Sequence, residues 1–336
     1  DRGAAGERSP FDREEAGLLK GENLEILVVT YHFLAGDLFP GKGVHPFGPE
    51  RFKAQVERLV LSARFLSVGD LVGEILPPLG AARRYALLTF DDGLAEQAEI
   101  AWPILEAKGI PAVFFPCTAP LETGRLLHVH RMHALRSAME DRELLALFAE
   151  LAKTRGFGET ARRIEKSEGL QAPYPYDSPE ARRVKSLFNY DLPVQERETL
   201  AELAFSQVFG EEGPWAERLY MTADTVRKLG RAGCLGSHTH THKPLASLEV
   251  EDVRREIAQS LDILERIAGT RPASVSYPYG NRLAVSAEVF AAASACGLRV
   301  GFTTERRLNF PGTDRLVLAR FDAEDLPPGK RPLFNP

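Results

Sequence analysis

Short apolar runs alternate with helical patterns along most of the chain. Seven runs are rich in apolar, β-branched and aromatic residues and are short enough to be strands: residues 24–34, 84–91, 112–118, 234–242, 272–279, 298–304 and 315–322. Between many of them, apolar residues recur at spacings of three and four, as on one face of a helix: residues 49–63, 95–108, 222–232, 247–268 and 285–295. This alternation predicts parallel βα units, and about seven strands favour a barrel over an open sheet.

Residues 120–219 interrupt the alternation, because no strong strand run appears there and helical patterns dominate. Residues with capping chemistry mark three helices: Asp141 within 130–154, Ser178 and Pro179 before a helix through Phe188, and Gly210 after 199–209. We therefore predict a helical insertion into the barrel. It serves either as a lid over the active site or as a packing or dimerisation element.

Composition narrows the function classes. The net charge of −5 leaves no whole-molecule footprint for a nucleic acid or an anionic membrane. No apolar run approaches the roughly 18 residues of a membrane-spanning helix, and the polar start carries no apolar core of a secretory signal. Residue 1 is Asp rather than Met, so a processed start stays open. The three cysteines are odd in number and far apart, which argues against a disulfide framework and predicts a cytoplasmic protein.

Two adjacent acidic residues follow the apolar run at 84–90. Asp91 and Asp92 stand in the sequence TFDDG, at the carboxyl end of a strand expected to be buried. Paired charges there are unfavourable unless a positive group compensates them. Consecutive side chains leave a strand in different directions, so one carboxylate can bind a metal while the other faces a substrate. Taken alone, the motif is equally typical of a simple turn.

Three of the eight histidines lie within five residues. His238, His240 and His242 share one face of an extended segment, whereas only His238 and His242 align in a helical turn. In either geometry two imidazoles can converge, and imidazoles with a carboxylate suit Zn²⁺ or a related divalent ion. Two His and one Asp would leave a coordination position for water, as in catalytic zinc sites.

An aromatic motif ends the run at 272–279. Tyr277 and Tyr279 flank Pro278, and Gly280 follows. Aromatic rings at a strand tip either stack on a sugar or belong to a rigid turn. The motif gains meaning only together with the other two.

In this order, the three motifs resemble those of the polysaccharide deacetylase family, the NodB-homology proteins of carbohydrate esterase family 4. The matching sequences are TFDDG at 89–93, HTHTH at 238–242 and PYG at 278–280, and VVTYH at 28–32 is similar to the family's first strand. The resemblance implies a distorted (β/α) barrel of about seven strands, and it spans roughly residues 24–322 with the insertion at about 120–219. Residues 1–23 are then an N-terminal extension, and 323–336 are a C-terminal tail.

The resemblance also implies one divalent metal ion, with zinc expected and cobalt or nickel as alternatives. It assigns roles by position: metal ligation to Asp92, His238 and His242, the general base to Asp91, and an oxyanion-binding backbone N–H to Tyr279. His240 falls at a variable position and is not assigned as a ligand. Such an ion lowers the pKa of bound water, and the base accepts the proton as that water attacks an amide.

The chain departs from the family pattern in two places. Ser276 and Tyr277 precede Pro278, where an arginine often orients the base, and no histidine follows His242 to act as the family's general acid. The matching late segment carries Arg320. A guanidinium is a poor proton donor, so Arg320 is expected to orient a carboxylate or to bind an anionic substrate group.

Other histidines are therefore candidates for the general acid. They are His32, His240 and a cluster at the start of the insertion: His128, His130 and His133. For the cluster, a solvated or core helix face is the favoured interpretation. We expect four residues to contact the substrate: His32, His240, Tyr277 and Arg320.

These observations predict a metal-dependent hydrolase that removes an N-acyl group, in the first place acetyl, from a sugar of a polysaccharide, a glycoside or its precursor. Its expected partner is that N-acylated sugar or glycan, and the sequence leaves the oligomeric state open. Two alternatives remain. One is hydrolysis of a formyl or cyclic amide at the same metal site, and the other is a carbohydrate-binding protein that kept the fold without turnover.

Overall fold

The strand β1 (Ile26–Tyr31) lies at the centre of a parallel sheet and is buried along its whole length. The computed structural model describes residues 24–73, 76–168 and 177–334. On one side β1 pairs with β3 (Arg84–Asp92), which pairs in turn with β2 (Ala63–Phe65) at its start and β4 (Ala112–Pro116) at its end. The near-continuous apolar sequences of these strands fit burial on both faces.

The sheet closes on itself through shorter strands. On its other side β1 pairs with β7 (Phe321–Asp322), while β5 (Ser274–Ser276) pairs with β6 (Val300–Phe302). Three isolated parallel bridges join the remaining edges: Phe114 with Leu235, Ser237 with Val275, and Phe302 with Leu318. All seven predicted runs therefore contribute to one closed ring. The ring is a distorted barrel, because the segment 234–242 is joined to its neighbours by isolated bridges and β7 pairs with β1 over two residues.

Side chains alternate between the interior and the exterior of this ring. Val28, Leu87, Phe115 and Phe302 belong to one interior cluster, contributed by β1, β3, β4 and β6. The alternate positions of the same strands join a second cluster with the surrounding helices, in which Phe52 and Leu229 take part. By the period of two, Asp91 falls on the interior face of β3, in step with Leu87.

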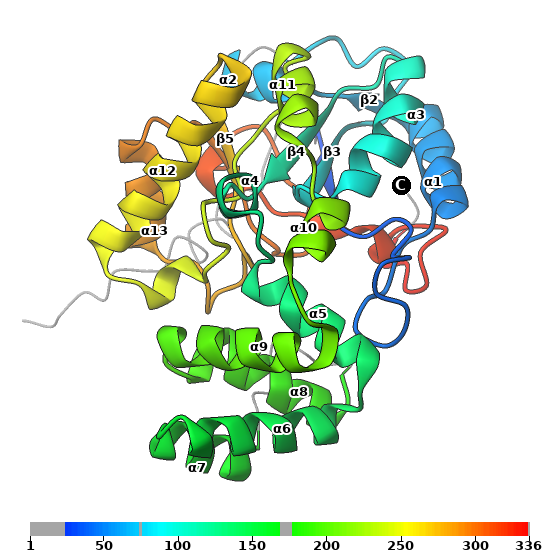
Figure 1. Ribbon diagram of the computed structural model, residues 1–336. Coiled ribbons are helices and arrows are strands. Elements are labelled where there is room, and N and C mark those ends of the chain that lie inside the picture. Colours follow the sequence, from blue (N-terminus) through cyan, green and yellow to red (C-terminus); the bar gives the residue numbers. More distant parts are fainter. Residues whose placement is uncertain (1–23, 74–75, 169–176, 335–336) are drawn as a thin grey trace, which may run out of the picture.

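Amphipathic helices cover the barrel (Figure 1). They are α1 (Pro49–Ser62), α2 (Val68–Gly73), the π-helical turn η2 (Gln97–Ala101) with α3 (Trp102–Ala107), α11 (Ala223–Arg231), α12 (Val250–Ala268) and α13 (Ala287–Ala295). In α12, Val253, Ile257, Leu261 and Leu264 are buried at the expected spacing. Three 3₁₀ turns complete this part: η4 (Leu245–Ser247), η5 (Arg315–Val317) and η6 (Ala323–Asp325).

As predicted, the described residues between β4 and α11 form helices joined by loops, with no β-strand among them. It comprises α4 (Ala119–Thr123), α5 (His128–Ala138), α6 (Asp141–Thr154), α7 (Gly158–Lys166), α8 (Pro179–Ser186), the π-helical turn η3 (Leu187–Asp191), α9 (Val194–Phe209) and α10 (Gly213–Leu219). Four of these helices, α6 to α9, form a layer beside one end of the barrel (Figure 1). This layer has its own core, in which Phe148 and Phe188 stack at 4.0 Å.

The helix ends test the capping predictions. Ser178 caps α8 by accepting a hydrogen bond from the N–H of Ala181, and α9 ends at Gly210, so both predictions are confirmed. Asp141 was predicted wrongly as a cap. Glu140 occupies that position and forms a reciprocal capping box with Glu143, which leaves Asp141 as the first residue of α6.

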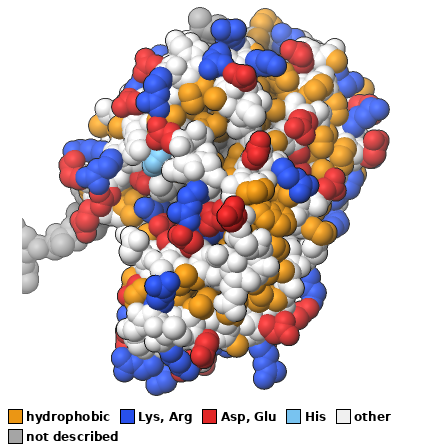
Figure 2. All heavy atoms as spheres, in the orientation of Figure 1, with side chains coloured by type: hydrophobic (Ala, Val, Ile, Leu, Met, Phe, Trp, Pro, Cys, Tyr) orange, Lys and Arg blue, Asp and Glu red, His pale blue; other side chains and the backbone are white. Residues whose placement is uncertain are grey.

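The surface shows no single-sign field on the face in Figure 2, where acidic and basic side chains are interspersed. Among the described residues, no helix combines the length and apolar character needed to span a bilayer.

Candidate active site

Three side chains from two motifs converge at the carboxyl end of the barrel. The ligand atoms of Asp92, His238 and His242 lie within 4.8 Å of one another. The Nε2 atoms of His238 and His242 face Asp92 Oδ1 at 3.3 and 3.4 Å. They meet because β3 and the segment after Leu235 are parallel members of one ring, so their carboxyl ends share an edge.

The donor set fits a divalent cation. Asp92 Oδ1 is buried and has no hydrogen-bond partner among the described residues. His238 Nδ1 donates to the carbonyl of Ser276 at 2.7 Å, which leaves the Nε2 lone pair directed at Asp92. Burial raises the pKa of Asp92, but the imidazoles around it outweigh burial and hold that pKa well below its usual value. A carboxylate and two imidazoles facing one point are ligands suited to Zn²⁺.

Backbone strain is concentrated in the same three motifs. In the described part of the chain, four residues other than glycine have a positive φ: Asp92 at 75°, Thr239 at 62°, His242 at 60° and Tyr279 at 61°. Such conformations cost on the order of 1–3 kcal/mol each and persist where the surroundings over-determine them. The glycine of TFDDG is also required, since a Cβ on Gly93 would lie 2.6 Å from a carbon of Pro116. The fold therefore holds these side chains in fixed directions.

Asp91 is paired with Arg320 inside the barrel. The guanidinium spans both carboxylate oxygens, with Nη1 2.9 Å from Oδ1 and Nη2 2.8 Å from Oδ2. Burial raises the pKa of Asp91, but the charge of Arg320, together with the nearby His238 and His32, outweighs burial and lowers that pKa to about 2. Asp91 is therefore ionised at neutral pH and held in one orientation, as a general base requires.

The prediction that Arg320 contacts substrate is wrong. Arg320 is only 1% exposed, and its other donors bond to Thr30, Thr89, Ser276 and the carbonyl of Thr303. Its side chain lies inside the closed barrel, away from solvent. The other role considered for it, orienting a carboxylate, is the one that this geometry fits.

Tyr277 and His240 are also not placed as predicted substrate contacts. Tyr277 is fully buried in the apolar cluster with Phe290. Both ring nitrogens of His240 are engaged: Nδ1 pairs with the hydroxyl of Thr118 at 2.9 Å, and Nε2 accepts from the amide of Gln259 at 3.0 Å. These contacts leave no nitrogen of His240 for a substrate.

His32 lies next to Asp91 and is partly exposed to solvent. Its side chain is 41% exposed, and Nε2 lies 3.8 Å from Asp91 Oδ2. Gln97, whose role the sequence did not reveal, donates to the backbone carbonyls of both His32 and Asp91 at 3.1 and 2.7 Å. One buried amide thus fixes the spacing of the two strand ends that carry these side chains.

Tyr279 borders the metal-binding residues. Its ring lies edge-on to that of His242, with centroids 4.9 Å apart, and its hydroxyl donates to Asn189 Oδ1 of the insertion at 3.3 Å. Among the described residues, the backbone N–H of Tyr279 has no hydrogen-bond partner. That N–H remains available for the predicted oxyanion role.

The insertion supplies one residue whose role the sequence did not reveal. His130 Nε2 faces Asp92 Oδ2 at 3.4 Å, whereas His128 and His133 bond through their rings to the carbonyls of Phe188 and Gly43. The interpretation of this cluster as a structural helix face fits His128 and His133, but His130 faces a residue of the site. The presence of three histidines on one helix was the available signal, but it could not distinguish among them.

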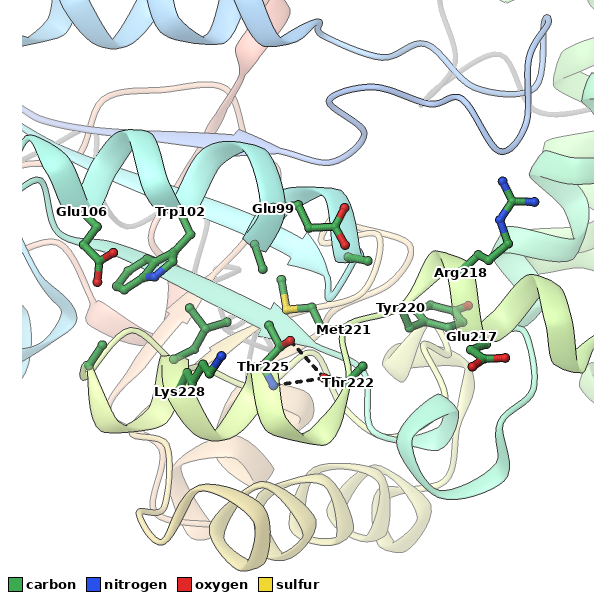
Figure 3. A pocket seen from close by; sticks show the side chains of 14 residues that line it. Glu99, Trp102, Glu106, Glu217, Arg218, Tyr220, Met221, Thr222, Thr225 and Lys228 are labelled. Atoms are coloured by element: carbon green, nitrogen blue, oxygen red, sulfur yellow. Dashed lines mark hydrogen bonds between the residues drawn. The ribbon is translucent and has the colours of Figure 1, made fainter.

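A groove on the outside of the barrel is separate from this site. It has a volume of about 730 Å³ and runs between α3 and α11, where Trp102, Glu106, Thr225 and Lys228 line it (Figure 3). None of the predicted site residues belongs to its lining. Tyr220 lies at one end of the groove and connects it to the insertion.

A parallel barrel with acidic and histidine side chains at its carboxyl end is the arrangement of many barrel enzymes. The sequence model of the family described as polysaccharide deacetylase matches residues 199–301. This stretch contains His238, His242 and the motif at 278–280, whereas Asp91 and Asp92 precede it. No curated protein sequence matches the chain significantly.

Solved structures, among them a deacetylase and a deacetylase domain, share the fold over most of the chain. The Streptococcus pyogenes deacetylase PplD, in complex with acetate, is 14% identical with a TM-score of 0.54, covering 89% of this chain and 92% of its own. IcaB from Ammonifex degensii is 17% identical with a TM-score of 0.51, covering 90% and 91%. The BpsB deacetylase domain from Bordetella bronchiseptica is 17% identical with a TM-score of 0.52, covering 89% and 96%. The resemblance to polysaccharide deacetylases is thus confirmed, and the fold is the α/β fold of the NodB-like deacetylases.

Proposed function

We propose that the protein is a divalent-metal-dependent hydrolase that removes an N-acetyl group from a sugar of a polysaccharide, a glycoside or its precursor. The observation that carries the proposal is the convergence of Asp92, His238 and His242 beside the paired carboxylate of Asp91. The family match and the shared fold of solved deacetylases support the same reaction class. Zinc is the proposed ion, since two imidazoles and one carboxylate are a common ligand set of catalytic zinc.

The residues divide the chemistry among them. An ion held by Asp92, His238 and His242 would supply Lewis acidity toward water and the amide oxygen. Asp91 accepts the proton of the water that attacks the amide carbon, and Arg320 keeps Asp91 ionised and oriented. The free N–H of Tyr279 is proposed as a donor to the developing oxyanion.

His32 is the proposed general acid. Hydrolysis of an amide releases a poor leaving group unless its nitrogen is protonated, and the chain has no histidine after His242. His32 lies 3.8 Å from Asp91, is partly open to solvent, and stands on the adjacent strand end. Acid and base would then flank the scissile bond from β1 and β3. A general acid at this place would supply the proton donor whose absence after His242 motivated the alternative of a binding protein without turnover.

We expect His32→Gln to lower kcat for N-acetyl sugars by about 100-fold, at the low end of the general acid–base range. An activated acetate ester needs no protonation of its leaving group, so its hydrolysis should fall less than fivefold in the same variant. The comparison of acetate release from both substrates tests the role. Equal losses on amide and ester would contradict it.

Metal analysis combined with a substrate panel tests the proposed function itself. Purified protein should hold about one equivalent of divalent metal and release acetate from at least one N-acetylated sugar or oligosaccharide. Release of formate or ring opening of a cyclic amide, without acetate release, would move the protein to the same-site alternative. Metal-free protein that still releases acetate would contradict the mechanism.

A further inference from the structure

His130 approaches Asp92 from the side that the other two histidines leave open. Its Nε2 faces Oδ2 at 3.4 Å, whereas His238 and His242 face Oδ1. The side chain of His130 is fully buried, and its Nε2 has no hydrogen-bond partner among the described residues. An N–H group at Nε2 would therefore face the second oxygen of Asp92.

Tyr220 determines which nitrogen of His130 carries the proton. The hydroxyl oxygen of Tyr220 accepts the backbone N–H of Leu127 at 2.9 Å and lies 2.6 Å from His130 Nδ1. A tyrosine hydroxyl has one proton, and Nδ1 is its remaining partner among the described residues, so the hydroxyl donates to Nδ1. The proton of neutral His130 is then on Nε2, directed at Asp92.

A buried ion pair joins the first part of the insertion to its last part, close to His130 and Tyr220. Arg131 of α5 forms a two-point ion pair with Glu212, which precedes α10, at 2.8 and 2.9 Å, and both side chains are buried. The pair links the segment that carries His130 to the segment that carries Tyr220. Tyr220 also lines the groove in Figure 3. The ion pair therefore helps to fix the positions of both His130 and Tyr220, the two residues that connect the insertion to Asp92.

We propose that His130 is a positioning residue for the metal-binding carboxylate, with Tyr220 fixing its tautomer. The inference rests on the metal site of the proposed function. With Oδ2 anchored by His130, the lone pairs of Oδ1 are held toward His238 and His242. Without His130, Oδ2 loses the N–H group that faces it, and the carboxylate can rotate. Partners of this kind are commonly worth 10–100-fold in metal affinity.

The zinc affinity of the whole protein, measured by competition with a chromogenic chelator, tests this role. We expect His130→Ala to weaken zinc binding by about 10–100-fold, and His130→Gln, which keeps a donor, to recover part of the loss. Tyr220→Phe should weaken binding by less, and adding it to His130→Ala should cause no further loss. His128→Ala is the control, since it removes a partly buried imidazole from the same helix without touching Asp92.

Each outcome bears on the inference. An affinity of His130→Ala within twofold of wild type would overturn it, and so would an equal loss in His128→Ala. If His130→Ala does not fold, Tyr220→Phe decides, and a zinc affinity equal to that of wild type would overturn the inference. At saturating Co²⁺, the visible absorption of His130→Ala should match wild type; a changed band would make His130 a ligand and overturn the positioning role. Wild-type protein that binds no zinc would overturn the proposed function as well.

Discussion

Asp91→Asn is expected to lower kcat/KM for N-acetyl sugars by about 10³–10⁴-fold while leaving bound metal in place. The amide is nearly isosteric with the carboxylate but cannot accept a proton from the attacking water. Asp91 does not take part in the candidate ligand set, which Asp92, His238 and His242 complete. Acetate release and metal content, measured on the same preparation, check the two halves of the expectation.

Comparing amide hydrolysis with ester hydrolysis, as for His32, distinguishes the base from the acid. Hydrolysis of an activated ester still needs water activation, so Asp91→Asn should lose ester and amide hydrolysis together, whereas His32→Gln should lose mainly the amide. Asp70→Asn is a suitable control, because Asp70, on the outer helix α2, accepts hydrogen bonds from the adjacent Ser67 and lies away from the site. If Asp91→Asn keeps more than a tenth of wild-type activity, Asp91 is not the base.

The barrel was predictable because its strands can be recognised from their local sequence. Parallel strands buried on both faces are near-continuous apolar runs, and all seven runs found in the sequence take part in the ring. The separation of 89–93 from 238–242 was no obstacle, since strand ends of a parallel barrel share one edge. The strand β2 was missed, because its three residues Ala63–Phe65 directly continue the helix pattern of α1.

The wrong predictions concern side-chain direction. Tyr277 and Ser276 are neighbours, so they point to opposite faces of the barrel wall, and only closure of the ring decides that Ser276 faces inward to Arg320. The same closure buries Arg320 inside the barrel, where it pairs with Asp91 and is not accessible to a substrate. His130 depends on an even longer-range fact, the position of α5 against the end of β3. No local pattern distinguishes it from His128 two residues earlier.

Arg320→Met is expected to destabilise the fold by about 3–5 kcal/mol, the range for removing one partner of a buried ion pair. The substitution leaves the carboxylate of Asp91 buried without its cation, with the Thr30 hydroxyl as a weak donor at 3.4 Å and His32 at 3.8 Å. Urea unfolding in excess chelator measures the change, so that differences in metal affinity do not enter. Arg255→Met, at an exposed one-turn pair with Asp252, should change stability by less than about 1 kcal/mol.

The double variant Asp91→Asn/Arg320→Met separates the pair from simple loss of packing. It contains neither buried charge, so it should be more stable than Arg320→Met alone, although it carries one more substitution. The pH dependence has the same origin. Because the pKa of Asp91 is lowered from 3.8 to about 2, the stabilisation by the pair is complete above about pH 4 and is lost as the pH falls through about 2. Arg320→Met should therefore lose less stability than wild type between pH 4 and pH 2. If the double variant is less stable than Arg320→Met, or if both proteins show the same acid dependence, then Arg320 acts through packing rather than through its charge on Asp91.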